Sequence, residues 1–228
     1  VADLCAQPAC PTVAGVVSAH PGDARFRETV TALAQERCVK GVRQVLHGAA
    51  TPAGYCLHDS FVDSVQRLGE LGLSFDVCIR PRELADAVEL ARRCPATTII
   101  IDHCGNADPK AFDNQPNDDE APWHEADGWK RDMDALARLD NTICKISGIV
   151  IRTREGGWTA EDLAPIVNHC WDAFGAERIV FGSDWPVCRL RAELAEWVTA
   201  LGEIVSERPD EEQRKLWGEN ARRFYALG

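Results

Sequence analysis

Two strand-like segments of this chain end in side chains that can bind a metal ion or move a proton. The first, TTIIIDHCG at residues 97–105, leads into His103, and the second, RIVFGSDWP at residues 178–186, leads into Asp184. In parallel α/β proteins, the carboxyl ends of buried strands open onto the loops that hold ligands. We therefore predict an active site in which His103 and Asp184 converge and Asp184 takes a proton from an attacking water.

Each of these two residues also has a structural interpretation. Asp184 could cap the following helix, although the helical pattern begins only near Arg191. His103 could be a hydrogen-bonded histidine of the core. If His103 is functional, it either binds a divalent ion or donates a hydrogen bond to a substrate oxygen, and the sequence leaves both uses open.

Three cations lie within or at the end of apolar runs, where a charge needs a partner. We expect Arg43 to bind a substrate anion or a carboxylate, unless it faces the surface at a strand edge. Arg80 precedes Pro81 and is expected either at the substrate or in a salt bridge at the start of a helix. Lys145 must meet a carboxylate, for which Asp184 is the expected partner, or a substrate oxygen.

Tryptophans and the other histidines are weaker candidates. Trp185 follows Asp184 and is expected to contact the substrate. The polar segment 106–122, which leads into Trp123 and His124, is long enough to fold over the site as a lid or to remain a solvated loop. Four further histidines are expected to make surface, loop or helix hydrogen bonds by default, namely His20, His47, His58 and His169.

Strand-like runs alternate with helical patterns along the chain. The expected strands cover residues 13–17, 41–46, 74–79, 97–101, 142–146 and 179–181, and the expected helices cover 25–38, 59–72, 82–93, 125–139, 159–174 and two segments after 191. This alternation predicts a parallel α/β sheet in a single domain over residues 1–228. Because no G-x-G-x-x-G motif follows the first strand, a doubly wound sheet is disfavoured, and we predict a (β/α)₈ TIM-barrel with about six of its eight strands present.

Composition narrows the class of partner and the location. The net charge is −11, which disfavours a nucleic-acid binder or a protein held on an anionic membrane. The ten cysteines include no C-x-x-C pair, so we expect reduced, mostly buried thiols and a cytoplasmic protein. A small-molecule substrate is the expected partner, and association into a homo-oligomer stays open.

Several longer motifs occur in the order found in one enzyme family. They are KGVRQVL (40–46), FDVCIRP (75–81), IDHCG (101–105), NTICKISG (141–148), FGAERIVFGSDWP (174–186) and GENARRFYAL (218–227). With these motifs the chain resembles the amidohydrolase-related family, in its branch of sugar-lactone hydrolases such as fuconolactonase, rhamnonolactonase and pyrone-dicarboxylate lactonase. The resemblance implies a distorted (β/α)₈ barrel in which the six runs are strands three to eight.

The same resemblance maps His103 and Asp184 onto metal ligands of the family, for one divalent ion such as Zn or Mn. Several lactonases of this branch work without a metal, so metal-independent chemistry stays open. The family also carries an H-x-H pair at the end of its first strand, and this sequence has none. We therefore expect strands one and two, and half of the metal site, to be missing from the chain.

The expected reaction is hydrolysis of the lactone, or cyclic ester, of a sugar acid. Asp184 would activate water, directly or beside a metal. The groups expected to hold the substrate and stabilise the carbonyl oxygen as it becomes negative are Arg43, Arg80, Lys145 and His103. Ser147 and Ser183 lack the G-x-S-x-G elbow that would expose a serine nucleophile.

Three other interpretations stay open. A metal-dependent decarboxylase uses the same superfamily barrel and would require Zn²⁺ or Mn²⁺. A non-catalytic protein that binds sugar acids would keep the cations without any turnover. A fragment whose barrel cannot close would be inactive, and its unpaired strand edges predict poor solubility or dimerisation.

Overall fold

Six parallel strands form one sheet in the computed structural model, which describes residues 1–113, 121–154 and 157–227. The strands are β1 (Gly15–Ser18), β2 (Val39–Val45), β3 (Ser74–Cys78), β4 (Ile99–Ile101), β5 (Thr142–Ile146) and β6 (Ile179–Phe181). They neighbour one another in sequence order, so β1 and β6 are the outer strands of this sheet. The predicted parallel α/β sheet and its six strands are confirmed.

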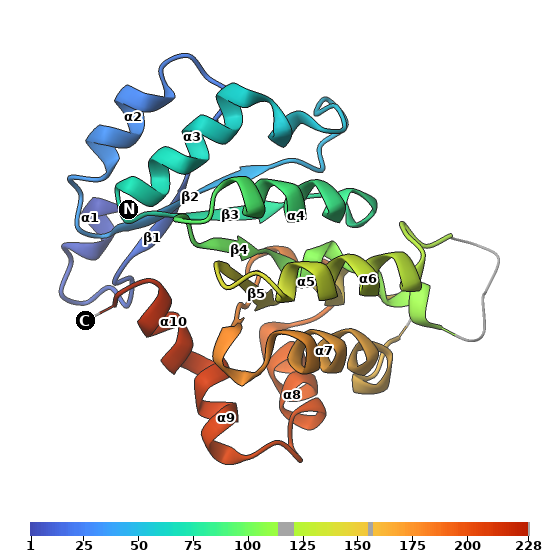
Figure 1. Ribbon diagram of the computed structural model, residues 1–228. Coiled ribbons are helices and arrows are strands. Elements are labelled where there is room, and N and C mark those ends of the chain that lie inside the picture. Colours follow the sequence, from blue (N-terminus) through green and yellow to red (C-terminus); the bar gives the residue numbers. More distant parts are fainter. Residues whose placement is uncertain (114–120, 155–156, 228) are drawn as a thin grey trace.

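Helices connect the strands and cover one side of the sheet. They are α1 (Ala2–Cys5), α2 (Phe26–Leu33), α3 (Asp59–Glu70), α4 (Leu84–Arg93), α5 (His103–Asn106), α6 (Ala126–Ala137), α7 (Ala160–Phe174), α8 (Leu194–Ile204), α9 (Asp210–Arg214) and α10 (Asn220–Phe224). Figure 1 shows α2, α3, α4, α6 and α7 following one another around the outside of the sheet, with α10 on its other side. We call these two sides the outer and the inner face.

Side chains of the strands alternate between the two faces, as the period of two in a β-strand requires. The outer face is apolar and packs under the helices, with Val42, Phe75, Val77, Ile99, Ile101 and Cys144 in the main core. The inner face carries Arg43, Asp76 and Lys145, which lie between those apolar residues in sequence. Arg43 pairs with Asp76 in the register of β2 and β3.

The amino-terminal part of the inner face is closed by α10. Ile100, Ile143 and Val180 from β4, β5 and β6 are buried there, and Ala221, Phe224 and Tyr225 pack against them. Arg43 and Asp76 lie on the neighbouring strands β2 and β3, and Lys145 follows Ile143 by two residues on β5. The inner face is therefore apolar over β4, β5 and β6 beneath α10 and charged where these three residues lie.

The local sequence explains where the longest helix begins and ends. Thr159 and Asp162 form a capping box at the start of α7, each side chain bonding to the backbone of the other. Gly175 follows the last turn with a φ of 71°, a conformation that glycine adopts without strain. Leu163, Ile166 and Val167 are fully buried on the face that meets the sheet.

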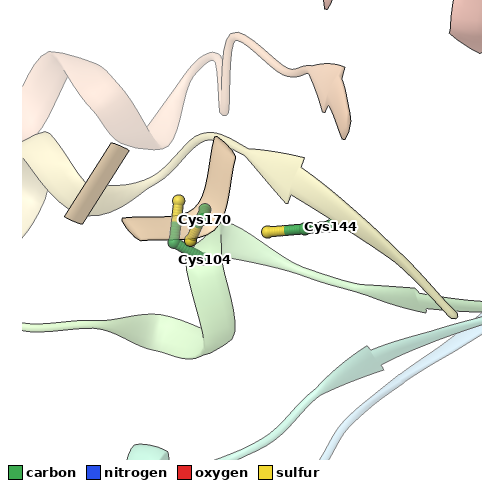
Figure 2. A group of neighbouring side chains, drawn as sticks. All are labelled: Cys104, Cys144 and Cys170. Atoms are coloured by element: carbon green, nitrogen blue, oxygen red, sulfur yellow. The ribbon is translucent and has the colours of Figure 1, made fainter. Parts of the chain in front are cut away.

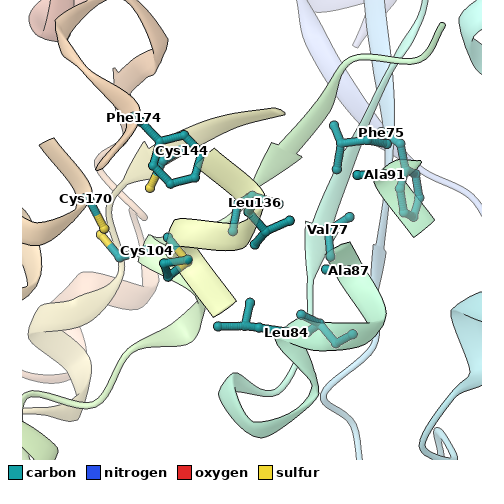
Figure 3. Packing of buried hydrophobic residues seen from close by; sticks show 14 of the residues in the cluster. Phe75, Val77, Leu84, Ala87, Ala91, Cys104, Leu136, Cys144, Cys170 and Phe174 are labelled. Carbon is teal, nitrogen blue, oxygen red and sulfur yellow. The ribbon is translucent and has the colours of Figure 1, made fainter. Parts of the chain in front are cut away.

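The ten cysteines are all free, and seven of them are buried. Three of the buried thiols gather between α5, β5 and α7, where Cys104, Cys144 and Cys170 lie within 4.8 Å of one another (Figure 2). We call these three residues the thiol cluster. Its surroundings are part of the main hydrophobic core, with Leu84, Leu136 and Phe174 close by (Figure 3).

The segment predicted as a lid is described only in part, because residues 114–120 lie outside the described residues. Before them, Pro109–Phe112 form a 3₁₀ turn. After them, His124 is buried at 8% exposure, and its Nε2 accepts the backbone N–H of Asp108 at 2.9 Å. Among the residues described, none of the helices is both long and apolar enough to cross a membrane.

His124 generates a prediction about stability and pH. Its Nε2 accepts a hydrogen bond and its Nδ1 faces the carbonyl of Glu125 at 3.1 Å, an arrangement that suits the neutral ring. Burial lowers the pKa of His124, although Asp108 and Glu125 oppose that shift. The unfolded chain therefore binds more protons as the pH falls below about 6.5, and the folded state loses stability there.

We expect the free energy of unfolding to fall more steeply in the wild type than in His124→Gln when the pH is lowered from about 7 to about 5. Urea denaturation at both pH values measures the difference. Equal slopes in the two proteins would contradict this role of His124.

Candidate active site

The carboxyl ends of the strands bring most of the candidate residues together. Arg43 comes from β2, Lys145 from β5, His103 from the turn after β4 and Asp184 from the loop after β6. His103 Nε2 lies 3.8 Å from Asp184 Oδ1, and each side chain is 12% exposed. The predicted convergence of these two groups is thus present in the structure.

A network of buried charges lies beneath this pair. Lys145 Nζ is 2.5 Å from Asp76 Oδ2 and 2.6 Å from Asp102 Oδ1, and both carboxylates are 1% exposed. Arg43 Nε lies 2.8 Å from the other oxygen of Asp102. The expected pairing of Lys145 with Asp184 is wrong, because the ammonium is already held between two carboxylates on the inner face.

The pKa values in this network follow from burial and from the alternation of charge. Burial alone would lower the pKa of Lys145, but Asp76 and Asp102 outweigh it and raise that pKa well above its usual range. Burial also acts to raise the pKa of Asp102, but Lys145, His103 and Arg43 together lower it. The surrounding cations therefore favour the ionised form of Asp102, which links Lys145 and Arg43.

His103 is held from both sides of its ring. Nδ1 lies 2.9 Å from Ser147 Oγ, and Nε2 lies 3.1 Å from Arg43 Nη2. A guanidinium only donates, so in this contact Nε2 accepts and Nδ1 carries the proton toward Ser147. Burial lowers the pKa of His103, but Cys78, Asp102 and Asp184 outweigh it and raise that pKa.

The backbone at both candidate groups is strained. His103 has a φ of 56° and Asp184 a φ of 53°, both in the left-handed region. All four residues of α5 have positive φ, so this segment is a left-handed turn. A non-glycine residue there costs on the order of 1–3 kcal/mol, and such strain persists where the surrounding packing enforces it.

Gly148 allows His103 to approach the end of β5. Its φ is 69°, and a Cβ placed on it would lie 2.5 Å from His103 Nδ1. Only glycine therefore fits beside this imidazole. The KISG motif supplies both this glycine and Ser147, which contacts the same ring atom.

Asp184 faces His103 instead of capping a helix. The helix α8 begins later, with a capping box between Glu193 and Glu196. Burial raises the pKa of Asp184, and His103 and Arg43 offset part of that rise. A raised pKa makes this carboxylate a stronger base than an exposed aspartate. Its neighbour Trp185 is 62% exposed at the rim of the site.

Arg80 lies in a different set of contacts. Its Nη1 binds Glu83 at 2.9 Å, and its Nη2 donates to the carbonyls of Gly48 and Thr51. The structure thus shows the salt bridge at a helix start, which was the alternative interpretation. A substrate contact of Arg80 stays a prediction.

The weaker candidates are placed by ring contacts and one ion pair. His47 meets Trp123 edge to face, with ring centroids 6.4 Å apart. The guanidinium of Arg152 stacks on Trp123, with its Cζ 3.0 Å from the ring centroid. His58 packs against Tyr55, and His169 Nε2 lies 3.0 Å from Asp134 Oδ1 on the helical layer. His20 is exposed.

Sequence reasoning missed five residues of the site, namely Asp76, Cys78, Asp102, Ser147 and Tyr225; Cys78 Sγ lies 3.2 Å from Arg43 Nη2. A signal existed for Asp76, because a charge inside the apolar run SFDVC needs a buried partner. Tyr225 gave no such signal, since its hydroxyl reaches Asp76 Oδ2 at 3.4 Å only through the packing of α10. Burial raises the pKa of this tyrosine.

Comparison with known proteins extends over nearly the whole chain. A family model described as "Amidohydrolase" matches residues 1–227. An L-fucono-1,5-lactonase of Burkholderia multivorans is 32% identical over 83% of this chain and 63% of its own length. An L-rhamnono-gamma-lactonase of Scheffersomyces stipitis is 25% identical over 90% of this chain and 66% of its own. This chain therefore spans less than two thirds of the length of either curated relative.

A solved structure shows the same fold. An amidohydrolase from Burkholderia multivorans, crystallised with bound Zn, superimposes with a TM-score of 0.86 at 28% identity. The match covers 99% of this chain and 77% of that one. The six-stranded α/β sheet corresponds to part of the barrel found in these neighbours.

The buried network generates a prediction about stability. Lys145→Met removes the ammonium that bridges two buried carboxylates and should destabilise the fold by about 3–5 kcal/mol, because Asp76 then loses its ion-pair partner inside the protein. Lys215 is the matched control, since it also bridges two carboxylates, Glu177 at 2.6 Å and Glu211 at 2.8 Å, but these carboxylates are 55% and 69% exposed. Lys215→Met should cost a small fraction of that amount. Urea denaturation of the two variants tests the contrast, and equal losses would contradict it.

Proposed function

The chain belongs to the amidohydrolase family, and on that premise we propose that it hydrolyses the lactone of a sugar acid. The observation that carries the proposal is the meeting of Asp184 and His103 beside Arg43 at the carboxyl ends of the strands. The two relatives named as sugar-lactonases support the choice of a cyclic ester as substrate.

Asp184 is the general base of the proposed reaction. Its carboxylate is mostly buried, and burial raises its pKa, so it accepts a proton from water more readily than an exposed aspartate does. The water adds to the lactone carbonyl carbon while its proton passes to Asp184. The ring C–O bond then breaks, and Asp184 returns the proton to the alkoxide, which stays tethered in the open acid.

Arg43 faces the carbonyl oxygen as it becomes negative, and His103, whose Nε2 accepts from this guanidinium, positions it. Arg43 is 37% exposed although Asp102 fixes its Nε, so part of the guanidinium remains open to a ligand. Positive charge that is already oriented stabilises an oxyanion without further reorganisation. Lys145 supports this arrangement indirectly, because it neutralises Asp76 and Asp102 below the site.

A divalent ion, when bound, would be held by His103 and Asp184, whose Nε2 and Oδ1 atoms are 3.8 Å apart and suit adjacent positions of one ion. Such an ion would act as a Lewis acid toward the ester carbonyl. These residues supply two ligands, whereas catalytic zinc sites use three protein ligands. Arg43 Nη2 also competes for His103 Nε2, which it contacts at 3.1 Å.

The proposed base can be tested by substitution. We expect the wild type to release acid from L-fucono-1,5-lactone or L-rhamnono-γ-lactone faster than the spontaneous reaction, and Asp184→Asn to lower kcat by at least about a hundredfold. Asp134→Asn is the matched control, because Asp134 also pairs with a histidine, His169, outside the site. A pH-stat assay measures all three proteins. Undiminished turnover in Asp184→Asn would remove this residue from the mechanism.

The metal ligands can be tested separately from turnover. Because His103 and Asp184 supply two ligands and Arg43 competes for one of them, we expect Zn²⁺ to bind this pair with a dissociation constant of about 1 μM or weaker. Asp184→Asn should abolish that binding, and Asp134→Asn should leave it unchanged. Isothermal titration with Zn²⁺ measures both. Retention of the same affinity by Asp184→Asn would show that the ion binds elsewhere.

A further inference from the structure

The thiol cluster lies outside the candidate active site, on the outer face of the sheet. Cys104, Cys144 and Cys170 come from three separate elements, α5, β5 and α7, and all three are fully buried. Figure 2 shows the Cys144 side chain extending from β5 toward the other two. Their sulfur atoms lie within 4.8 Å of one another.

This spacing suits a single ion bound by three sulfurs. Bonds of about 2.3 Å from one centre to each sulfur place the sulfurs roughly 3.5 to 4 Å apart, depending on the angle at the centre. A small contraction of the observed cluster reaches that separation. The other two elements need not move far, because α5 and α7 both pack against β5.

Charge decides which ion the cluster accepts. The surrounding side chains are apolar, including Leu136 and Phe174 (Figure 3). A net charge buried there would be costly. Burial raises the pKa of both Cys144 and Cys170, whereas hydrogen bonds with these two thiols lower the pKa of Cys104 despite its burial.

A complex of three thiolates with a monovalent or divalent ion keeps a net negative charge in this apolar core. Three thiolates with Cu⁺ carry two negative charges, and three thiolates with Zn²⁺ carry one. Structural zinc sites also need a fourth ligand. Among the described residues, the cluster contains only these three cysteines as histidine, cysteine or carboxylate ligands. A trivalent ion that takes three sulfurs leaves a neutral complex and needs no further ligand.

We propose that Cys104, Cys144 and Cys170 form a binding site for a trivalent thiophilic ion, of which arsenite is the accessible form. Arsenous acid, As(OH)₃, exchanges its three hydroxyl groups for three thiolates. Three As–S bonds form, three As–O and three S–H bonds break, and the protons leave with the hydroxyl groups as three waters. Arsenic stays trivalent, so no oxidant or reductant is needed.

The test must first remove competing thiols. Cys5, Cys10 and Cys38 are partly exposed, and they would capture arsenite themselves. The triple variant Cys5→Ser, Cys10→Ser, Cys38→Ser leaves seven cysteines, all of them buried. We would incubate this variant with arsenite both as the native protein and during refolding from urea, then remove free arsenite by gel filtration.

Native mass spectrometry should show one arsenic per chain, with the mass raised by one arsenic atom less three hydrogens. In the same background, Cys170→Ala should reduce the bound arsenic at least about tenfold. Cys94→Ala should keep it, and is the matched control because Cys94 is equally buried but lies outside the cluster. No arsenic retained by either route, or equal retention in Cys170→Ala, would overturn the proposal.

X-ray absorption of the loaded triple variant gives a readout that needs no cluster mutation. Three sulfur neighbours and no oxygen neighbour around arsenic are expected. One or two sulfurs with oxygen would overturn the three-thiol site. Zn²⁺ retained at the cluster as tightly as arsenite would overturn the argument from charge.

Discussion

The ammonium of Lys145, held between Asp76 and Asp102, is the interaction on which the candidate site depends. It joins β3, the end of β4 and β5 on the inner face, where both carboxylates are buried. Two carboxylates this close repel each other unless a cation lies between them. Asp102 then uses its second oxygen to fix Arg43. Arg43 in turn contacts His103, so the imidazole is positioned through a chain of alternating charges.

Strained backbone conformations also help to position His103 and Asp184, in addition to the charge network. The left-handed turn of α5 rotates His103 toward Ser147 and Asp184, and Asp184 adopts the same region of φ at the end of β6. For a non-glycine residue this region of φ costs roughly 1–2 kcal/mol. Packing against Gly148, where no side chain is tolerated, keeps the imidazole close to β5.

The two faces of the same strands separate two kinds of chemistry. On β5, Lys145 points to the inner face, and its neighbour Cys144 points to the outer face. The same division separates His103 from Cys104 in the turn after β4. A polar site and an apolar thiol cluster therefore share a backbone without sharing an environment. The candidate active site lies on the inner face, and the thiol cluster belongs to the helix-covered core.

The sequence by itself determined the order of strands and helices, the family, and the two strand ends that carry His103 and Asp184. It could do so because apolar periodicity and strand-end motifs are local properties of the chain. Only the tertiary structure decided which ion-pair and hydrogen-bond partners the buried site residues have. Lys145 pairs with Asp76 and Asp102, and not with Asp184, because the register of neighbouring strands sets which inner-face side chains meet. Likewise the hydroxyl of Tyr225 reaches Asp76 although the two residues are 149 positions apart in sequence. Contacts between distant residues depend on strand register and helix packing, and neither is written in local sequence pattern.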